Sequence, residues 1–166
     1  MMNISNLSAS YTVTLLTKKD IPILLSLCEG NPQYYKYCPP AVTREGLLSD
    51  LKALPKGKTL ADKYYVGFWE DSSLIAVMDL ILQYPDDQTA FIGFFMMEHA
   101  RQGKGIGSLI IDEVCAFLKK HFSFVRLGYV KDNPQSKAFW LKNAFLPTGT
   151  VVSADAYDIV IMQRSL

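Results

Sequence analysis

Hydrophobic and polar positions follow two periods along this chain, one typical of strands and the other typical of helices. Residues 11–16 alternate between apolar and polar positions and are rich in β-branched side chains. Residues 63–69, 74–84 and 89–97 are largely apolar and are separated by short polar turns. The pattern therefore predicts one strand followed by an antiparallel meander of three more.

Helices are predicted where a capping residue precedes apolar positions at helical spacing. One follows the Thr17-Lys-Lys-Asp20 capping box, one follows Thr43, and one follows Asn133-Pro134. Another covers residues 106–118, where apolar residues recur every three to four positions. Further strands are expected at residues 124–130, 145–152 and 157–163.

The order of these elements predicts a mixed α/β (α+β) fold rather than a doubly wound parallel sheet. We expect a mostly antiparallel central sheet of about seven strands with about four flanking helices. A chain of 166 residues, 49% of them hydrophobic, suits a single domain over residues 1–166. Residues 1–10 lack the basic and apolar regions of a secretory signal and are expected to form a flexible leader.

Charge and cysteine content exclude several classes of function. The formal net charge is +1, and no run of five like charges could follow a nucleic-acid backbone, so nucleic acid is not an expected partner. The apolar run 74–82 is too short to cross a membrane and is interrupted by Asp79. Cys28, Cys38 and Cys115 form no close pair, which argues against disulfides and a metal site and favours the cytoplasm.

A glycine-rich turn joins the strand 89–97 to the helix 106–118. Gly103, Gly105 and Gly107 occupy alternate positions, so the backbone can turn sharply and leave the first N–H groups of the helix facing outward. Such a corner binds phosphate groups, or it is an empty tight turn. A dinucleotide-binding turn has different glycine spacing and follows a first strand, and a P-loop ends in Gly-Lys-Ser/Thr, so neither motif fits.

Two motifs resemble the GNAT superfamily of acyl-CoA-dependent N-acetyltransferases. Its main motif, Gln/Arg-x-x-Gly-x-Gly/Ala after the fourth strand, is similar to Gln102-Gly-Lys-Gly-Ile-Gly107. Its second motif, Asn-Pro-x-Ala-x-x-Phe/Leu-Tyr-x-Lys-x-Gly-Phe, is similar to residues 133–145. The resemblance covers roughly residues 11–166 and is strongest over 94–145. It implies a sheet splayed between its fourth and fifth strands and acetyl-CoA as co-substrate, with no metal.

The resemblance also implies where coenzyme A would bind. Backbone N–H groups of the glycine turn would hold its pyrophosphate, and its pantetheine arm would lie between the splayed strands, near Asn133. Asn133 is also placed to cap the helix that begins at Pro134, and one side chain can serve both roles. The implied cofactor-binding residues are Phe95, Met96, Met97, Gln102, Gly103, Lys104, Gly105, Ile106, Gly107, Ser108, Asn133, Ser136 and Trp140.

Acetyl transfer to an amine needs a base for the nitrogen and benefits from a proton donor for the leaving thiolate. Asp79 is a candidate base because it interrupts an apolar strand, although it could instead pair with a cation or face solvent. Glu98 is the second candidate, or an ordinary surface carboxylate. Family members often use a tyrosine as the acid where this chain has Trp140, whose indole N–H cannot act so. The remaining donors are solvent, Tyr84 and Tyr129.

The sequence thus favours an N-acetyltransferase in which a primary amine of a small molecule or peptide attacks acetyl-CoA directly in a ternary complex. Two alternatives stay open: a non-catalytic acyl-CoA-binding module and a nucleotide-binding protein unrelated to coenzyme A. By analogy with the family, Tyr34, Tyr35 and Tyr37 would wall the acceptor side, or they pack over the core. The acceptor itself and whether the chain forms a homodimer are left open.

Overall fold

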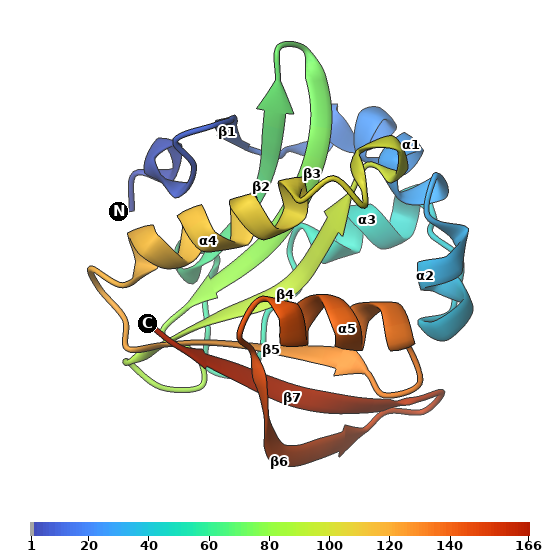
Figure 1. Cartoon of the computed structure of the whole chain (residues 1–166). Helices are drawn as coiled ribbons and strands as arrows, with labels where there is room; N and C mark the ends of the chain where they lie inside the picture. The colour runs from blue at the N-terminus through green and yellow to red at the C-terminus, as the bar shows by residue number, and fades with distance from the viewer. Residues whose placement is uncertain (1) are drawn as a thin grey trace.

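A seven-stranded sheet runs through the centre of the protein in the order β1-β2-β3-β4-β5-β7-β6 (Figure 1). The computed structural model describes residues 2–166. Neighbouring strands are antiparallel except β4 and β5, which are parallel, so the predicted mixed fold is confirmed. The strands are β1 Thr12–Leu15, β2 Lys63–Glu70, β3 Ser73–Leu82, β4 Thr89–Met97, β5 Phe124–Val130, β6 Leu146–Ser153 and β7 Asp158–Ser165.

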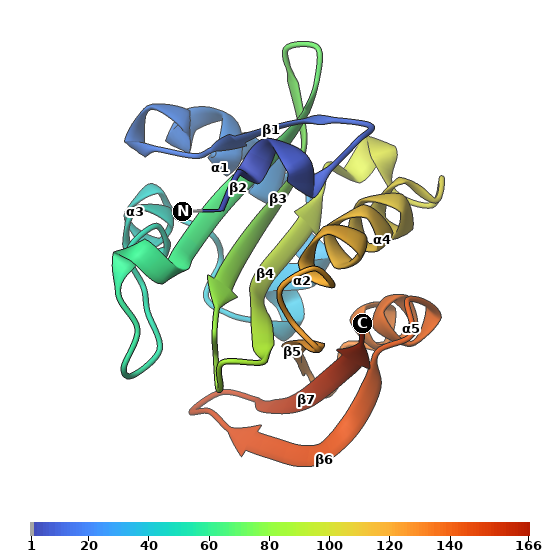
Figure 2. The ribbon, with the colours of Figure 1, turned by 90° about the vertical axis from the view of Figure 1, so that its left-hand side faces the viewer.

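Helices cover both faces of the sheet (Figures 1 and 2), with α1 and α3 on its left and α4 and α5 on its right in Figure 2. Two apolar cores result: α1 and α3 pack on Tyr65 and Val77, whereas α4 and α5 pack on Val66, Phe68 and Met78. Alternation along β2 separates these sets, because successive side chains of a strand point to opposite faces. The helices are α1 Ile21–Glu29, α2 Pro32–Tyr37, α3 Arg44–Asp50, α4 Ile106–Leu118 and α5 Pro134–Lys142.

Pro39 and Pro40 disfavour regular structure, so the sequence predicts an aromatic loop over residues 33–40, but the structure forms the helix α2 there. Pro32 occupies the first turn, where a missing N–H costs nothing, and the helix ends at Tyr37, before Pro39 and Pro40. The prolines therefore end this helix rather than prevent it. The helix holds Tyr34 and Tyr35 against the sheet, where Tyr34 meets Phe94 edge to face at 5.8 Å between ring centroids.

Residues 2–10 pack against α4 instead of forming the expected flexible leader; Met1 lies outside the described residues. Leu7 is fully buried in the core, and the hydroxyls of Ser8 and Ser10 donate to the carboxylate of Glu113. Burial would raise the pKa of Glu113, but these hydrogen bonds together outweigh it and lower the pKa. Glu113 is polar at a position of α4 where the apolar spacing would place a hydrophobic residue, and it anchors the N-terminal segment.

A β-bulge in β4 coincides with the point where its pairing with β5 ends. Asp79 and Leu80 on β3 are opposite Phe94 and Ile92, so Gly93 is an extra residue in β4, a β-bulge. Pairing with β5 ends at the same place, with Ile92 opposite Leu127, although both strands continue. The two strands diverge beyond this point (Figure 1), as the predicted splay requires.

The end of α5 contains a non-glycine residue in the left-handed region. Ala144 has φ +65°, and the turn is closed by hydrogen bonds from Ala144 N–H to Leu141 C=O and from Phe145 N–H to Trp140 C=O, both 3.1 Å long. This is the Schellman pattern, in which glycine is preferred because an alanine Cβ is strained at positive φ. Ala144 stands where the similar motif has glycine, which predicts a less extreme backbone angle; the positive φ of Ala144 shows that this prediction is wrong.

We predict that Ala144→Gly stabilises the protein by about 0.5–1 kcal/mol, because relief of the strained φ exceeds the added entropy of the unfolded chain. Urea unfolding at neutral pH measures the effect. The matched control is Ala138→Gly, at an exposed position inside the same helix, which is expected to lose about 1 kcal/mol. Equal destabilisation by both substitutions would contradict the strain argument.

Candidate functional site

The glycine turn between β4 and α4 has the geometry of an anion-binding corner. Gly103 and Gly105 have φ of +73° and +79°, and a Cβ on either would meet no heavy atom within 4 Å, so the space beside them is open. The first helical hydrogen bond of α4 runs from Leu109 N–H to Gly105 C=O, 3.0 Å. The N–H groups of Ile106, Gly107 and Ser108 precede it and face out of the helix end, where the helix dipole favours negative charge.

Gly107 serves helix packing rather than clearance in front of the turn. A Cβ here would lie 3.2 Å from Cε2 of Phe139 and 3.5 Å from Cγ of Met97. The glycine therefore lets α4 approach the ring of Phe139 on α5. Its side-chain position faces the protein, so only its N–H belongs to the anion-binding corner.

The glutamine of the motif holds the turn to the rest of the fold. Gln102 Nε2 donates to Asn31 Oδ1 at 2.6 Å and to Met97 C=O at 3.2 Å. Asn31, which is buried between α1 and α2, donates to the same Met97 carbonyl and to Leu27 C=O, both at 3.0 Å. Gln102 thus acts on the turn by positioning it, whereas Lys104 is exposed next to the open space.

An aromatic cluster lines the α5 side of the divergent strands. Phe95 stacks on Phe139 with ring centroids 5.9 Å apart, and Trp140 contacts both rings and Phe145 at 4.9–6.0 Å. Trp140, Met96 and Met97 are all at least nine-tenths buried. Beyond Ile92, the edge of β4 that faces β5 has no strand partner, so backbone N–H and C=O groups there are available to a ligand.

Asn133 and Ser136 lie together at the start of α5. The side-chain oxygen of Asn133 accepts from Ser136 N–H at 3.2 Å, so the predicted helix cap is confirmed. Asn133 is 4% exposed, and Pro134 occupies the first helical position. The cap uses the amide oxygen of Asn133 and leaves its NH₂ group available to another acceptor.

Asp79 forms a buried ion pair on the face covered by α1–α3. Its Oδ2 lies 2.7 Å from Lys63 Nζ, which also donates to Ala53 C=O at 3.0 Å; the two side chains are 15% and 2% exposed. The other oxygen, Oδ1, is buried without a hydrogen-bond partner in the described chain. Burial raises the pKa of Asp79, and Lys63 opposes this only in part. A Cβ on Gly93 would lie 3.1 Å from Oδ2, so glycine in the bulge makes room for the carboxylate.

A cavity of about 440 Å³ opens beside Asp79 and the bulge. Tyr34 and Tyr35 of α2 line it, whereas Tyr37 is not among its lining residues; that these tyrosines wall an acceptor stays a prediction. The sequence reasoning missed Asp50, Tyr65 and Tyr157, which also line it. Tyr65 is directly opposite Asp79 across β2 and β3, so the period-two pattern could have found it once the strands were aligned.

The other predicted acids lie elsewhere. Tyr84 packs against Phe91 at the β3–β4 turn, with ring centroids 5.3 Å apart, and does not line this cavity. Tyr129 is buried in β5, beyond the last residue that pairs with β4. The structure therefore does not bring either hydroxyl to Asp79.

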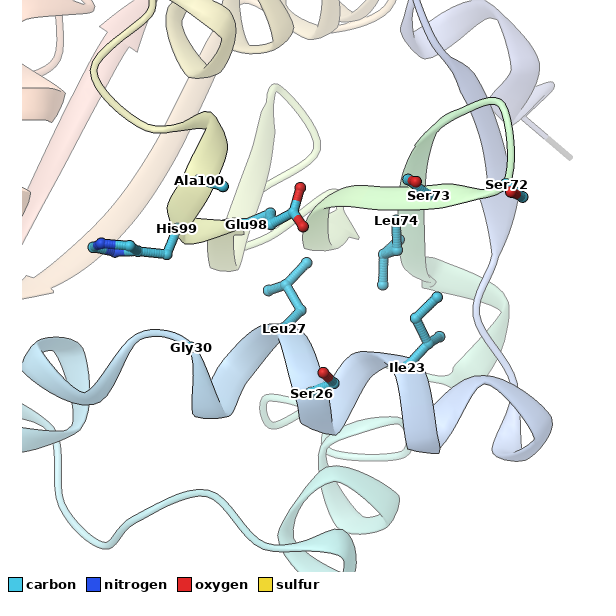
Figure 3. Close-up of a pocket in the computed structure, with 10 residues that line it drawn as sticks. All are labelled: Ile23, Ser26, Leu27, Gly30, Ser72, Ser73, Leu74, Glu98, His99 and Ala100. Atoms are coloured by element: carbon cyan, nitrogen blue, oxygen red, sulfur yellow. The ribbon is translucent and has the colours of Figure 1, made fainter.

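Glu98 lies in a second, open cavity of about 490 Å³ between α1, the start of β3 and the turn after β4 (Figure 3). Glu98 faces the same space as Leu27 and Leu74 in Figure 3, and its carboxylate lies 3.5 Å from Nε of Arg101. Arg101 also pairs with Glu70. The two predicted bases, Asp79 and Glu98, thus belong to different cavities.

Two further observations concern the described residues as a whole. Within residues 2–166, no three His, Cys, Asp or Glu side chains gather into a group that could hold a metal ion. No helix in that range has the length and apolar character needed to cross a membrane.

Comparisons with solved structures agree on the fold. An acetyltransferase from Thermus thermophilus superposes with a TM-score of 0.75 at 21% identity, over 93% of this chain and 96% of that one. The PaiA N-acetyltransferase of Thermoplasma acidophilum, solved with coenzyme A, gives 0.65 at 19% identity over 93% and 98%. The Salmonella typhimurium enzyme that modifies the N-terminal serine of ribosomal protein L7/L12 gives 0.74 at 16% over 96% and 97%.

No curated relative matches the sequence significantly. The model of the acetyltransferase (GNAT) family matches residues 32–145, which include both motifs, the bulge and most of the residues around the Asp79 cavity. Since this match covers well over half of the 166 residues, the chain belongs to the acetyltransferase (GNAT) family.

Proposed function

We propose that the protein transfers the acetyl group of acetyl-CoA to a primary amine by direct attack in a ternary complex, and that residues 1–166 serve as one domain for this reaction. The observation that carries the proposal is the position of the Gly93 bulge, which lies both at the end of the β4–β5 pairing and beside the cavity of Asp79. The pairing of β4 with β5 ends there, and Gly93 and Phe94 also line the cavity of Asp79. An amine in that cavity and a thioester along the edge of β4 that faces β5 would therefore be neighbours.

The residues of the cofactor side fit coenzyme A. Open space beside Gly103 and Gly105, outward N–H groups at the start of α4 and the exposed charge of Lys104 suit a pyrophosphate. The free backbone of β4 and the amide of Asn133 suit the amide groups of a pantetheine arm. When bound, acetyl-CoA supplies an activated acetyl thioester.

Asp79 is the residue we propose as the proton acceptor. A primary amine is protonated at neutral pH and must lose a proton before its nitrogen can attack. Asp79 lines the acceptor cavity, is held in place by Lys63, and has an oxygen without a hydrogen-bond partner in the described chain. Glu98 is a weaker candidate because its cavity is a different one and Arg101 pairs with it.

Three proton donors can serve the leaving thiolate: Tyr129, Tyr84 and solvent. Trp140 belongs to the aromatic cluster and cannot donate a proton at ordinary pH. Tyr129 stays a candidate because it lies on the part of β5 that no longer pairs with β4, and Tyr84 is the weaker of the two because it packs at the β3–β4 turn. A coenzyme A thiolate is also stable enough to leave without a donor and to take its proton from solvent.

We predict that Gly105→Ala weakens coenzyme A binding about tenfold, because an alanine at φ +79° costs about 1–2 kcal/mol and distorts the turn. Isothermal titration calorimetry with coenzyme A measures the loss. The matched control is Gly57→Ala, which has the same strain at φ +85° and equally open space, but lies in the loop before β2. If both variants bind coenzyme A equally well, the turn does not hold the cofactor.

We predict that Asp79→Asn lowers turnover by about 10²-fold or more, with little change in coenzyme A affinity. Because the pKa of Asp79 is raised above 3.8, its carboxyl stays protonated to a higher pH, and kcat/KM should fall as the pH drops through that raised pKa. Thiol release at several pH values measures both effects. Asp87→Asn, at an exposed turn position, is the control and should match the wild type.

The outcomes separate the alternatives. Unchanged turnover in Asp79→Asn would remove Asp79 from the mechanism. Tight binding of coenzyme A by the wild type, with no amine-dependent thiol release over a broad panel of amines and peptides, would instead indicate a binding module. Preference for ATP or NAD over coenzyme A would contradict the proposed cofactor.

A further inference from the structure

The acceptor cavity presents negative charge and aromatic rings, without a positive side chain on its surface. We propose that its acceptor is a small amine that carries a second positive charge, held by Asp50 at the mouth of the cavity while the reacting nitrogen lies at Asp79. This inference rests on the proposed function and names the substrate class of the same site. It makes Asp50 a specificity-determining residue.

The charges around the cavity are unbalanced. Its described lining residues include two carboxylates, those of Asp50 and Asp79, and no Lys, Arg or His. Lys63 lies behind the wall with its side chain 2% exposed, where it pairs with Asp79. One cation against two carboxylates leaves a net negative charge, and Asp50 is the carboxylate that has no direct ion pair in the described chain.

The two carboxylates come from different elements that line the same cavity. Asp79 is on the sheet next to the bulge, and Asp50 is an exposed residue at the end of α3. Tyr65, directly opposite Asp79 on β2, also lines this cavity. An elongated molecule with a charge at each end can therefore meet Asp79 with one nitrogen and Asp50 with the other.

The rest of the wall suits a cation as well. Five aromatic rings line the cavity, those of Tyr34, Tyr35, Tyr65, Phe94 and Tyr157, and ring faces attract ammonium groups. Burial raises the pKa of Tyr34 and Tyr65 well above the usual range, and a hydrogen bond with Cys38, aided by burial, raises the pKa of Tyr157 to about 12. The rings stay neutral at physiological pH, so they add no competing charge.

The size of the cavity favours a small molecule. About 440 Å³ lies within the range of cavities that enclose compact ligands. The prolines before α3 and Tyr157 at the β6–β7 turn also line it, and Cys38 Sγ lies 3.4 Å from the hydroxyl of Tyr157. In the reaction, the ammonium nitrogen at Asp79 gives one proton to that carboxylate and bonds to the acetyl carbon as the carbon–sulfur bond breaks. Its second proton goes to the leaving thiolate, directly or through solvent, whereas the nitrogen at Asp50 stays protonated.

The test compares amines that share one spacer and differ at the far end. 1,4-Diaminobutane, n-pentylamine and 5-aminopentanoate end in an ammonium, a methyl group and a carboxylate. With acetyl-CoA saturating and ionic strength constant, kcat/KM from thiol release should be about tenfold higher for the diamine than for pentylamine, corrected for its pair of equivalent nitrogens. The carboxylate should make 5-aminopentanoate the poorest of the three.

Asp50→Asn tests the assigned residue. It should reduce the preference for the diamine over pentylamine by about threefold or more, mainly through a higher KM for the diamine. The control is Glu45→Gln on the same helix, which removes an equal charge outside the cavity lining and should keep the wild-type preference. An Asp50→Asn enzyme with unchanged preference would remove Asp50 from acceptor recognition.

Failure of this inference is distinguishable from failure of the proposed function. If pentylamine or 5-aminopentanoate is acetylated as well as the diamine, the second charge is not recognised and the inference is overturned, while acetyl transfer to an amine stands. If coenzyme A binds and none of the three amines, nor a panel of peptides, releases thiol, the proposed function and the inference are both overturned.

Discussion

The Gly93 bulge in β4 is the feature on which the candidate site depends. One extra residue ends the pairing of β4 with β5 after Ile92 and shifts the side-chain alternation that follows. Phe94 consequently packs with the α1–α3 core, and Phe95 packs with the α4–α5 core. The same residue thus opens the sheet, gives each half of the site its wall and leaves room for the carboxylate of Asp79.

The ion pair beside the bulge is costly for the fold. A carboxylate and an ammonium that are 15% and 2% exposed have lost most of their hydration, and a buried pair seldom repays that loss in stability. The unpartnered oxygen of Asp79 adds to the cost. An apolar pair of similar volume would be expected to pack at least as well here, so the charges fit a role in substrate chemistry better than a role in stability.

The sequence predicted what is set by local pattern. The strand Thr89–Met97 and the helix Ile106–Leu118 have the predicted bounds. Hydrophobic periodicity and capping depend on residues that are neighbours in the sequence, so they can be recognised without the fold. The cofactor turn was predictable for the same reason. The acceptor cavity was not, because Tyr65, Asp50 and Tyr157 meet Asp79 only through strand register, the end of α3 and the distant β6–β7 turn. Glu113 likewise gave no local signal of its partners Ser8 and Ser10.

The division of the site between the two faces also explains how the chain tolerates Trp140. The proposed cofactor side consists of α4, α5 and the aromatic cluster, where the large ring of Trp140 packs on Phe95, Phe139 and Phe145. Deprotonation of the amine is assigned to the opposite face, at Asp79. Removal of a proton from an amine with a pKa near 10 is the harder transfer at neutral pH, since a thiolate leaves readily. Trp140 packs without donating a proton, so the step that loses its donor is protonation of the thiolate, the less demanding of the two proton transfers.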